Sequence, residues 1–181
     1  GSEMCIRDRD KGYDIDGFTE SFTIGKDREL DVMLAGADVI GNLAPLKMLH
    51  AVGLVNGEEY KSLQRALVDI YGIVERGELV IEEGIEDVHS QIELLLVREC
   101  GDAGKKIHTG RSRNDQVLLD LKLFTREAIF ETLEHIERLF DLLIRRAEEN
   151  KDVLIPGYTH LQVAMPSSFG LWFGAYAESL A

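Results

Sequence analysis

The sequence predicts an all-α protein: a small N-terminal helical domain followed by the start of a central bundle of long helices. Apolar residues recur at steps of three and four along most of the chain, the period of a helix packed on one face. From Asn114 to Asn150 there is neither proline nor glycine, so one helix can run through the whole stretch. We expect residues 12–107 to form the N-terminal domain and residues 108–181 the incomplete first part of the bundle. Residues 1–11 are charged and lack an apolar period, so we leave them unassigned as a tail or an artefact.

Composition limits the class of protein. The chain has 181 residues and is 45% hydrophobic, which is enough for a real core. Its net charge of -13 argues against nucleic-acid binding, which needs a broad basic surface. Cys5 and Cys100 are its two cysteines, so no disulfide framework is implied and we expect a cytoplasmic protein. The longest apolar run, Phe169 to Ala177, is too short to cross a bilayer, so we expect no membrane partner.

The first two helices of the N-terminal domain follow from capping and breaking residues. Asp27 precedes a stretch with helical spacing, in which Pro45 is expected to force a break or a kink. Asn56 and Glu59 have the spacing of a capping box, so they predict the start of a second helix. Gly77 is expected to close that helix.

The rest of this domain is predicted from shorter signals. Residues 78–82 alternate briefly between polar and apolar, which favours a short extended segment. Asp87 can cap a further helix, and Gly101 and Gly104 are expected to end it.

The long helix is the most informative element. At about 1.5 Å per residue, a helix of this length measures about 55 Å, more than the width of a small domain. Apolar side chains such as Leu118, Phe130 and Leu142 lie off its main stripe, so several of its sides need cover. We therefore expect a multi-helix bundle formed between subunits, with a monomeric bundle as the alternative.

After the long helix we expect a break over residues 152–162, and then a helix from Ser167 to Ala181 opened by Pro166. That last stretch is apolar and reaches Ala181 without a cap or a breaker. We interpret the chain as an N-terminal fragment.

A cluster of cations precedes the long helix. Lys105, Lys106, Arg111 and Arg113 are interleaved with hydroxyl and amide side chains. Because backbone N–H groups at a helix start are unpaired, such a place suits an anion, and the pattern predicts a carboxylate or phosphate cradle. The alternative is a solvated basic loop.

Three motifs carry a family resemblance. These are His108-Thr109-Gly110-Arg111-Ser112-Arg113-Asn114-Asp115-Gln116-Val117, Pro156-Gly157-Tyr158-Thr159-His160-Leu161-Gln162 and, upstream, Glu86-Asp87-Val88-His89. In their order and spacing the chain resembles the argininosuccinate lyases, the family that includes the delta-crystallins of the eye lens. The resemblance covers about residues 12–181.

The resemblance implies an all-helical homotetramer that needs no cofactor. Such enzymes cleave argininosuccinate to arginine and fumarate in arginine biosynthesis. Each active site is assembled from three subunits, which supply in turn the segment matching Ser112 to Asn114, the segment matching Thr159 and His160, and a mobile loop with a catalytic serine. This sequence ends before that loop, so we expect the 181 residues alone to be inactive. Carried over residue by residue, the resemblance makes His160 catalytic and assigns substrate binding to Asp27, His89, Ser112, Arg113, Asn114 and Thr159.

The residue types fit this chemistry. Eliminating an amine from a succinyl group builds negative charge on a carboxylate, which needs preorganised donors such as Ser112, Arg113 and Asn114. His160 can carry a proton near neutral pH. The five histidines show no metal-ligand spacing, so we expect no metal site. His89 and His160 can instead be structural, and two rival functions stay open: another fumarate-releasing lyase, or a crystallin-like protein without activity.

Overall fold

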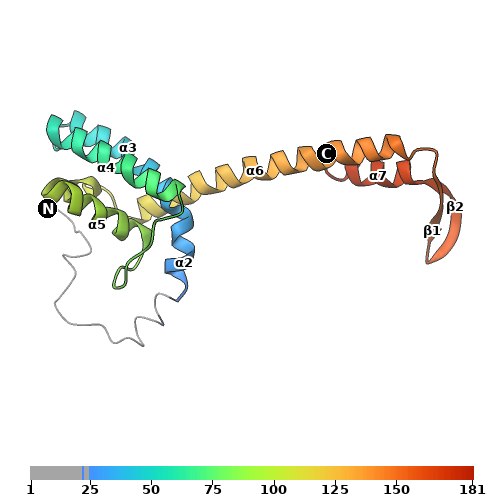
Figure 1. Ribbon diagram of the computed structural model, residues 1–181, viewed down its shortest axis with the longest axis horizontal. Coiled ribbons are helices and arrows are strands. Elements are labelled where there is room, and N and C mark those ends of the chain that lie inside the picture. The colour runs from blue at the N-terminus through green and yellow to red at the C-terminus, as the bar shows by residue number, and fades with distance from the viewer. Residues whose placement is uncertain (1–21, 23–24) are drawn as a thin grey trace. The chain divides into compact units, whose positions relative to one another are not determined.

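The computed structural model describes residue 22 and residues 25–181 (Figure 1), and for Asp27 it describes the backbone only. The predicted mostly helical fold is confirmed, with the addition of one two-stranded sheet. The elements, in chain order, are α2 Asp27–Asp31, η2 Val32–Leu34, α3 Ala35–Ala51, α4 Gly57–Glu75, α5 Val88–Cys100, η3 Gly101–His108, α6 Arg113–Glu149, β1 Leu154–Thr159, β2 Gln162–Ser168 and α7 Phe169–Glu178, where η denotes a 3-10 helix.

Contacts divide the chain into two compact units within α6, the first ending at Phe124 and the second running from Thr125 to Ala181. The expected boundary between residues 107 and 108 stays a prediction, and the expected tail at residues 1–11 lies outside the described residues. In the first unit, α3, α4 and α5 share one apolar core. Its largest buried aliphatic side chains are at most 1% exposed: Leu46, Leu49, Leu63, Leu67, Ile92 and Leu96. Removing this much apolar surface from water is what holds the unit together.

Helix α3 runs through Pro45 without interruption, so the first alternative, a break, is wrong, and the second, a kink, stays a prediction. A proline inside a helix forfeits one backbone hydrogen bond and crowds the preceding turn. Leu46 and Leu49 after the proline, and Val39 before it, are each 1% exposed in the same core. Packing on both sides of Pro45 therefore outweighs the local cost.

The predicted helix ends of α4 and α5 are confirmed. Asn56 Oδ1 accepts from the backbone N–H of Glu59 at 2.9 Å, and Glu59 Oε2 accepts from the N–H of Asn56 at 2.9 Å, which completes the capping box. Asp87 Oδ1 accepts from the N–H of Ser90 at 2.7 Å. Gly77 and Gly101 follow their helices with φ of +68° and +60°, a conformation that favours glycine.

Two other expectations for this region are refined. In the segment of residues 78–82, Leu79 and Ile81 are buried while Val80 is 70% exposed, as the alternation predicts. The segment nevertheless pairs with no other strand in the described part of the chain. Gly104 does not end α5 but lies in η3, where an added Cβ would approach the backbone of Val97 to 2.6 Å.

The long helix is confirmed: α6 has 37 residues, from Arg113 to Glu149. In the second unit many of its apolar side chains are between 41% and 55% exposed, namely Ile129, Phe130, Leu133, Leu139, Leu142 and Ile144. The described residues of this chain therefore leave a large apolar area of α6 uncovered.

The expected break after the long helix is confirmed, since α6 ends at Glu149, but an antiparallel hairpin of β1 and β2, which was not predicted, fills it. His160 and Leu161 have φ of +51° and +64° and connect the paired residues Thr159 and Gln162. Positive φ at both central residues is what a tight two-residue hairpin turn requires.

Pro166 lies in β2 rather than at a helix start, so that expectation is also wrong. Helix α7 begins three residues later at Phe169, where Ser168 Oγ accepts from the N–H of Leu171 at 3.2 Å. Its second residue, Gly170, lies so close to the end of α6 that an added Cβ would come within 2.6 Å of Lys151 Cα.

The stretch from Arg28 to Ala51 is long and apolar enough to cross a membrane by length and composition. Apolar residues of its α3 part pack in the core described above, and two polar residues of the same helix, Asp38 and Asn42, are buried as well. A core helix passes the same compositional test, and that is our interpretation of this stretch.

Candidate functional site

The loop before α6 is closed by a reciprocal cap. The N–H of Ser112 donates to Asp115 Oδ2 at 2.7 Å, and the N–H of Asp115 donates to Ser112 Oγ at 3.3 Å. Hydrogen bonds that the backbone N–H and the side chain of Ser112 make to its carboxylate hold the pKa of Asp115 below its ordinary value.

Alternate residues of this loop face in opposite directions. Ser112 and Asn114 are exposed, whereas Arg111 and Arg113 are partly buried. Two of the predicted substrate-binding residues, one hydroxyl and one amide, therefore lie at the solvent-facing start of α6. There the helix dipole and the first unpaired N–H groups favour an anion.

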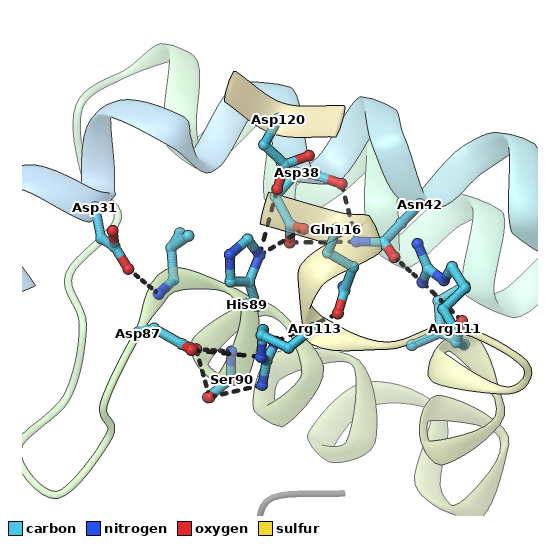
Figure 2. Close-up of polar contacts among 12 residues, drawn as sticks. Asp31, Asp38, Asn42, Asp87, His89, Ser90, Arg111, Arg113, Gln116 and Asp120 are labelled. Carbon is cyan, nitrogen blue, oxygen red and sulfur yellow. Dashed lines mark hydrogen bonds and ion pairs between the residues drawn. The ribbon is translucent and has the colours of Figure 1, made fainter. Parts of the chain in front are cut away.

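Arg113 lies across the start of α5 (Figure 2). Its guanidinium is 3.5 Å from Asp87 Oδ2, 3.3 Å from Ser90 Oγ and 3.4 Å from Gln116 Oε1. These are long contacts, and the side chain is 29% exposed. Such a guanidinium can exchange these weak partners for a carboxylate that offers two parallel hydrogen bonds.

Arg111 is held from inside the protein. Its Nη2 donates to Asn42 Oδ1 at 2.5 Å and to the carbonyl of Ile107 at 2.8 Å. Its Nε is buried and has no hydrogen-bond partner among the described residues. Burial lowers the pKa of Arg111 from its ordinary value, although the charges of Asp38 and Asp120 oppose the change.

The two lysines of the predicted cradle also have carboxylate partners. Lys106 Nζ is 2.7 Å from Glu59 Oε1, and Lys105 Nζ is 2.9 Å from Asp102 Oδ1. The candidate anion site therefore consists of the segment Ser112 to Asn114 without the two lysines. That this segment binds an anion stays a prediction.

His89 is 3% exposed and faces two carboxylates (Figure 2). Its Nδ1 is 2.9 Å from Asp38 Oδ1 and 3.3 Å from Asp120 Oδ2, and both aspartates are 1% exposed. Burial alone would lower the pKa of His89, but the hydrogen bond to Asp38 and the charges of Asp38 and Asp87 raise it. Burial and the neighbouring Asp38 raise the pKa of Asp120 to about 7. That His89 binds substrate stays a prediction, and its Nδ1 already contacts the two aspartates.

The remaining predicted site residues lie elsewhere. Thr159 is exposed at the end of β1, and His160 is exposed in the hairpin turn, both in the second unit. His160 has a positive φ, which is uncommon outside glycine and often marks a functional turn. Asp27 is the first residue of α2, and its side chain lies outside what the structure describes.

Sequence reasoning missed the polar cluster beneath the loop. Asp38, His89 and Asp120 come from α3, α5 and α6, and each offers a possible metal-ligand atom within 4.8 Å of the other two. The spacing of histidines along the chain cannot reveal such a group. A usable signal was present in α3, where Asp38 and Asn42 stand four residues apart among apolar neighbours.

Comparisons with known proteins identify relatives of this chain. The family model described as lyase matches residues 16–181. The argininosuccinate lyase of Bacteroides fragilis is 62% identical over 171 residues, which cover 94% of this chain and 38% of that protein. The argininosuccinate lyase of Parabacteroides distasonis is 61% identical with the same coverage. The chain thus spans 38% of the length of these relatives.

Solved structures show the same fold at lower identity. A fumarate lyase:delta crystallin from Brucella melitensis in native form has a TM-score of 0.71 and 18% identity, over 94% of this chain and 43% of that one. An EDDS lyase variant with bound fumarate has a TM-score of 0.60 and 22% identity, over 94% of this chain and 33% of that one. With the family model matching nearly the whole chain, the chain belongs to the lyase family.

Proposed function

We propose that the protein is an argininosuccinate lyase, which cleaves argininosuccinate reversibly into arginine and fumarate in arginine biosynthesis. The observation that carries this proposal is the 62% identity over 171 residues to a relative of that name. The arrangement of side chains around the start of α6 supports it on chemical grounds.

The reaction requires a base to remove a proton from the carbon next to a carboxylate. Electrons from that C–H bond then form the double bond of fumarate as the bond to the arginine nitrogen breaks. Before that bond breaks, negative charge accumulates on the carboxylate, and fixed donors lower the barrier by stabilising it. Ser112 and Asn114 offer exposed donors at the start of α6, and Arg113 offers a loosely held guanidinium beside them.

His160 is proposed to transfer a proton in this reaction. An imidazole can act as base or acid near neutral pH, and the elimination needs both a base for carbon and an acid for the leaving nitrogen. The exposed position of His160 in a turn of fixed backbone geometry supports this role. Thr159 next to it supplies a hydroxyl for the substrate.

We further propose a cytoplasmic homotetramer whose active sites are shared between subunits. The exposed apolar side chains of α6 support association, because burying apolar area is the main driving force for it. The family resemblance assigns the catalytic serine to a loop that follows the segment matched here. Asp27 and His89 complete the proposed substrate-binding set.

The test is an assay of the full-length protein with argininosuccinate, following fumarate by its ultraviolet absorbance. Aspartate, adenylosuccinate and ethylenediamine-disuccinate serve as competing substrates of related chemistry. We expect fumarate from argininosuccinate alone. The proposed function would be wrong if the protein released fumarate from one of the competing substrates, or if a folded oligomer released none from argininosuccinate.

A further inference from the structure

We propose that Arg111 is a positioning residue: it fixes the segment Ser112 to Asn114 onto a buried polar cluster formed by Asp38, Asn42, His89 and Asp120. The inference rests on the proposed function, since it concerns how the same site is held. It assigns Arg111 to a role different from substrate binding, although this arginine belongs to the same cationic motif.

Arg111 joins the loop to two other elements. Its Nη2 donates to Asn42 of α3 at 2.5 Å and to the carbonyl of Ile107 in η3 at 2.8 Å. Both acceptors lie inside the first unit, so this nitrogen of the guanidinium is already occupied by the protein. The neighbouring Ser112 is exposed. Holding Arg111 inward therefore determines where Ser112 can point.

Asn42 is itself oriented by the cluster (Figure 2). Its Nδ2 donates to the carbonyl of Asp38 at 2.9 Å and to Asp38 Oδ2 at 3.2 Å. Because the amide nitrogen is engaged on that side, the amide oxygen faces Arg111. The other oxygen of Asp38 contacts His89 Nδ1 at 2.9 Å.

Asp120 links this chain of contacts to α6. Its Oδ2 is 3.3 Å from His89 Nδ1, and the helix that carries it begins at Arg113, one residue after Ser112. Gly41 leaves room for the carboxyl, since a Cβ there would lie 3.0 Å from Asp120 Oδ1 and 3.2 Å from Leu119 Cδ2. Helices α3, α5 and α6 thus meet at one point directly beneath the loop.

A metal ion is the other occupant that this donor set would suit. Both oxygens of Asp38, however, already face donors from His89 and Asn42, and the positive charge of Arg111 acts on both aspartates. Both carboxyl oxygens of Asp120 are buried without a hydrogen-bond partner among the described residues, and its pKa is raised to about 7. A proton can therefore neutralise this carboxyl, and the cluster serves the loop without a cation.

The test compares Arg111→Met, Arg111→Lys and Asn42→Ala in the full-length protein. Arg98→Lys is the control, because it alters an arginine contact away from the loop, in which Nη1 and Nη2 both bind the carboxylate of Glu82 at the exposed surface. The readouts are kcat and KM for argininosuccinate, Tm, and hydrogen exchange of the peptide covering residues 108–116. Asn42→Ala keeps the arginine and removes only its acceptor, so it decides the matter if Arg111→Met does not fold.

We expect Arg111→Met and Asn42→Ala to lower kcat by on the order of 10²-fold with little change in KM, the signature of misplaced rather than missing contacts. Exchange at residues 108–116 should accelerate, and Arg111→Lys should recover part of both losses. Arg98→Lys should match the parent.

Parental kcat in folded Arg111→Met or Asn42→Ala would overturn the inference, even with faster exchange. An equal loss in Arg98→Lys would do the same. The inference would also be overturned if Zn²⁺ raised the Tm of the parent but not that of Asp120→Asn, since the cluster would then be a metal site. If the parent releases no fumarate, the proposed function fails, whatever the role of Arg111. In that case hydrogen exchange still tests the positioning role, and exchange at residues 108–116 that is the same in Arg111→Met and Asn42→Ala as in the parent would overturn it.

Discussion

The buried environment of Asp120 favours the protonated form of its carboxyl. Its side chain is 1% exposed, and burial together with the nearby charge of Asp38 raises its pKa to about 7. The pKa of His89 is raised as well. A raised pKa in the folded state means that folding favours the protonated form. Asp120 therefore stabilises the fold most at low pH, and its contribution is lost as pH rises from about 4, near the unfolded pKa of an aspartate, through about 7. The contribution of His89 is lost at higher pH, above the ordinary pKa of a histidine.

Replacing Asp120 with asparagine should make the stability of the fold depend less on pH. One bound proton contributes a slope of at most about 1.4 kcal/mol per pH unit, and asparagine binds none. We expect the parent to lose Tm between pH 5 and pH 8 on the order of a few degrees more than Asp120→Asn does. Thermal melts of both proteins across this range provide the measurement. Parallel Tm profiles would mean that Asp120 does not take up the proton.

His160→Asn separates chemistry from backbone geometry. Asparagine tolerates the positive φ of this turn, so the hairpin should persist, but it cannot carry a proton at neutral pH. We expect kcat of the full-length protein to fall by on the order of 10²-fold or more. Leu161→Asn is the matched control in the same turn and should keep most activity. A variant at position 160 with parental turnover would make His160 a structural residue.

The residues of the candidate site differ in how far sequence could predict them. Ser112, Arg113 and Asn114 are adjacent, so a motif reveals them together, and the structure adds which of them face solvent. Asp38 and Asp120 are 82 positions apart in the sequence. Only packing brings them within reach of His89, and no local pattern encodes that packing.

At the scale of helices and strands, signals between near neighbours predicted the structure well. The capping box of Asn56 and Glu59 and the cap at Asp87 both form, because each depends on residues within one turn. Prolines were less informative. Pro45 is tolerated inside α3 by its packing, and Pro156 faces Pro166 across the hairpin. A proline's effect is decided by tertiary neighbours that the local sequence does not show.

The capping box of α4 offers a test at this scale. Asn56→Ala removes the acceptor for the N–H groups of Glu58 and Glu59, and we expect the free energy of unfolding to fall by about 1 kcal/mol. Asp69→Ala, at an exposed position in the middle of the same helix, is the control and should change it by less than about 0.5 kcal/mol. Urea unfolding of both variants provides the comparison. Equal midpoints would show that the cap contributes nothing.

For the molecule as a whole, the exposed apolar side of α6 is the dominant feature. Phe130 is 55% exposed and Ile129 is 54% exposed, on a helix otherwise rich in charge. Covering apolar surface is worth about 25 cal/mol per Å², which is large beside a domain stability of about 5–15 kcal/mol. The predicted multi-helix bundle between subunits supplies such cover, and its formation stays a proposal.

The 181-residue chain expressed by itself should therefore associate or aggregate. It should also release no fumarate from argininosuccinate, because the family resemblance assigns the catalytic serine to a loop outside these residues. Size-exclusion chromatography over a range of concentrations measures the first, and the ultraviolet assay measures the second. Replacing Phe130 and Ile129 with glutamate should shift the elution toward the monomer, because charge opposes burial of this surface. A monodisperse monomer with steady turnover would contradict both expectations.

We propose that the start of α6 and the hairpin turn contribute to one active site from different subunits. Asn114 is exposed and has no side-chain hydrogen bond within the described part of the chain, so Asn114→Ala should remove a substrate contact without disturbing the fold. The direct measurement is the rate of fumarate release from hybrid oligomers of full-length Asn114→Ala and His160→Asn subunits. We expect each variant alone to be nearly inactive and the hybrids to recover substantial activity, because some sites then combine two intact segments. Hybrids no faster than the two separate variants, alongside an active parent, would contradict the claim.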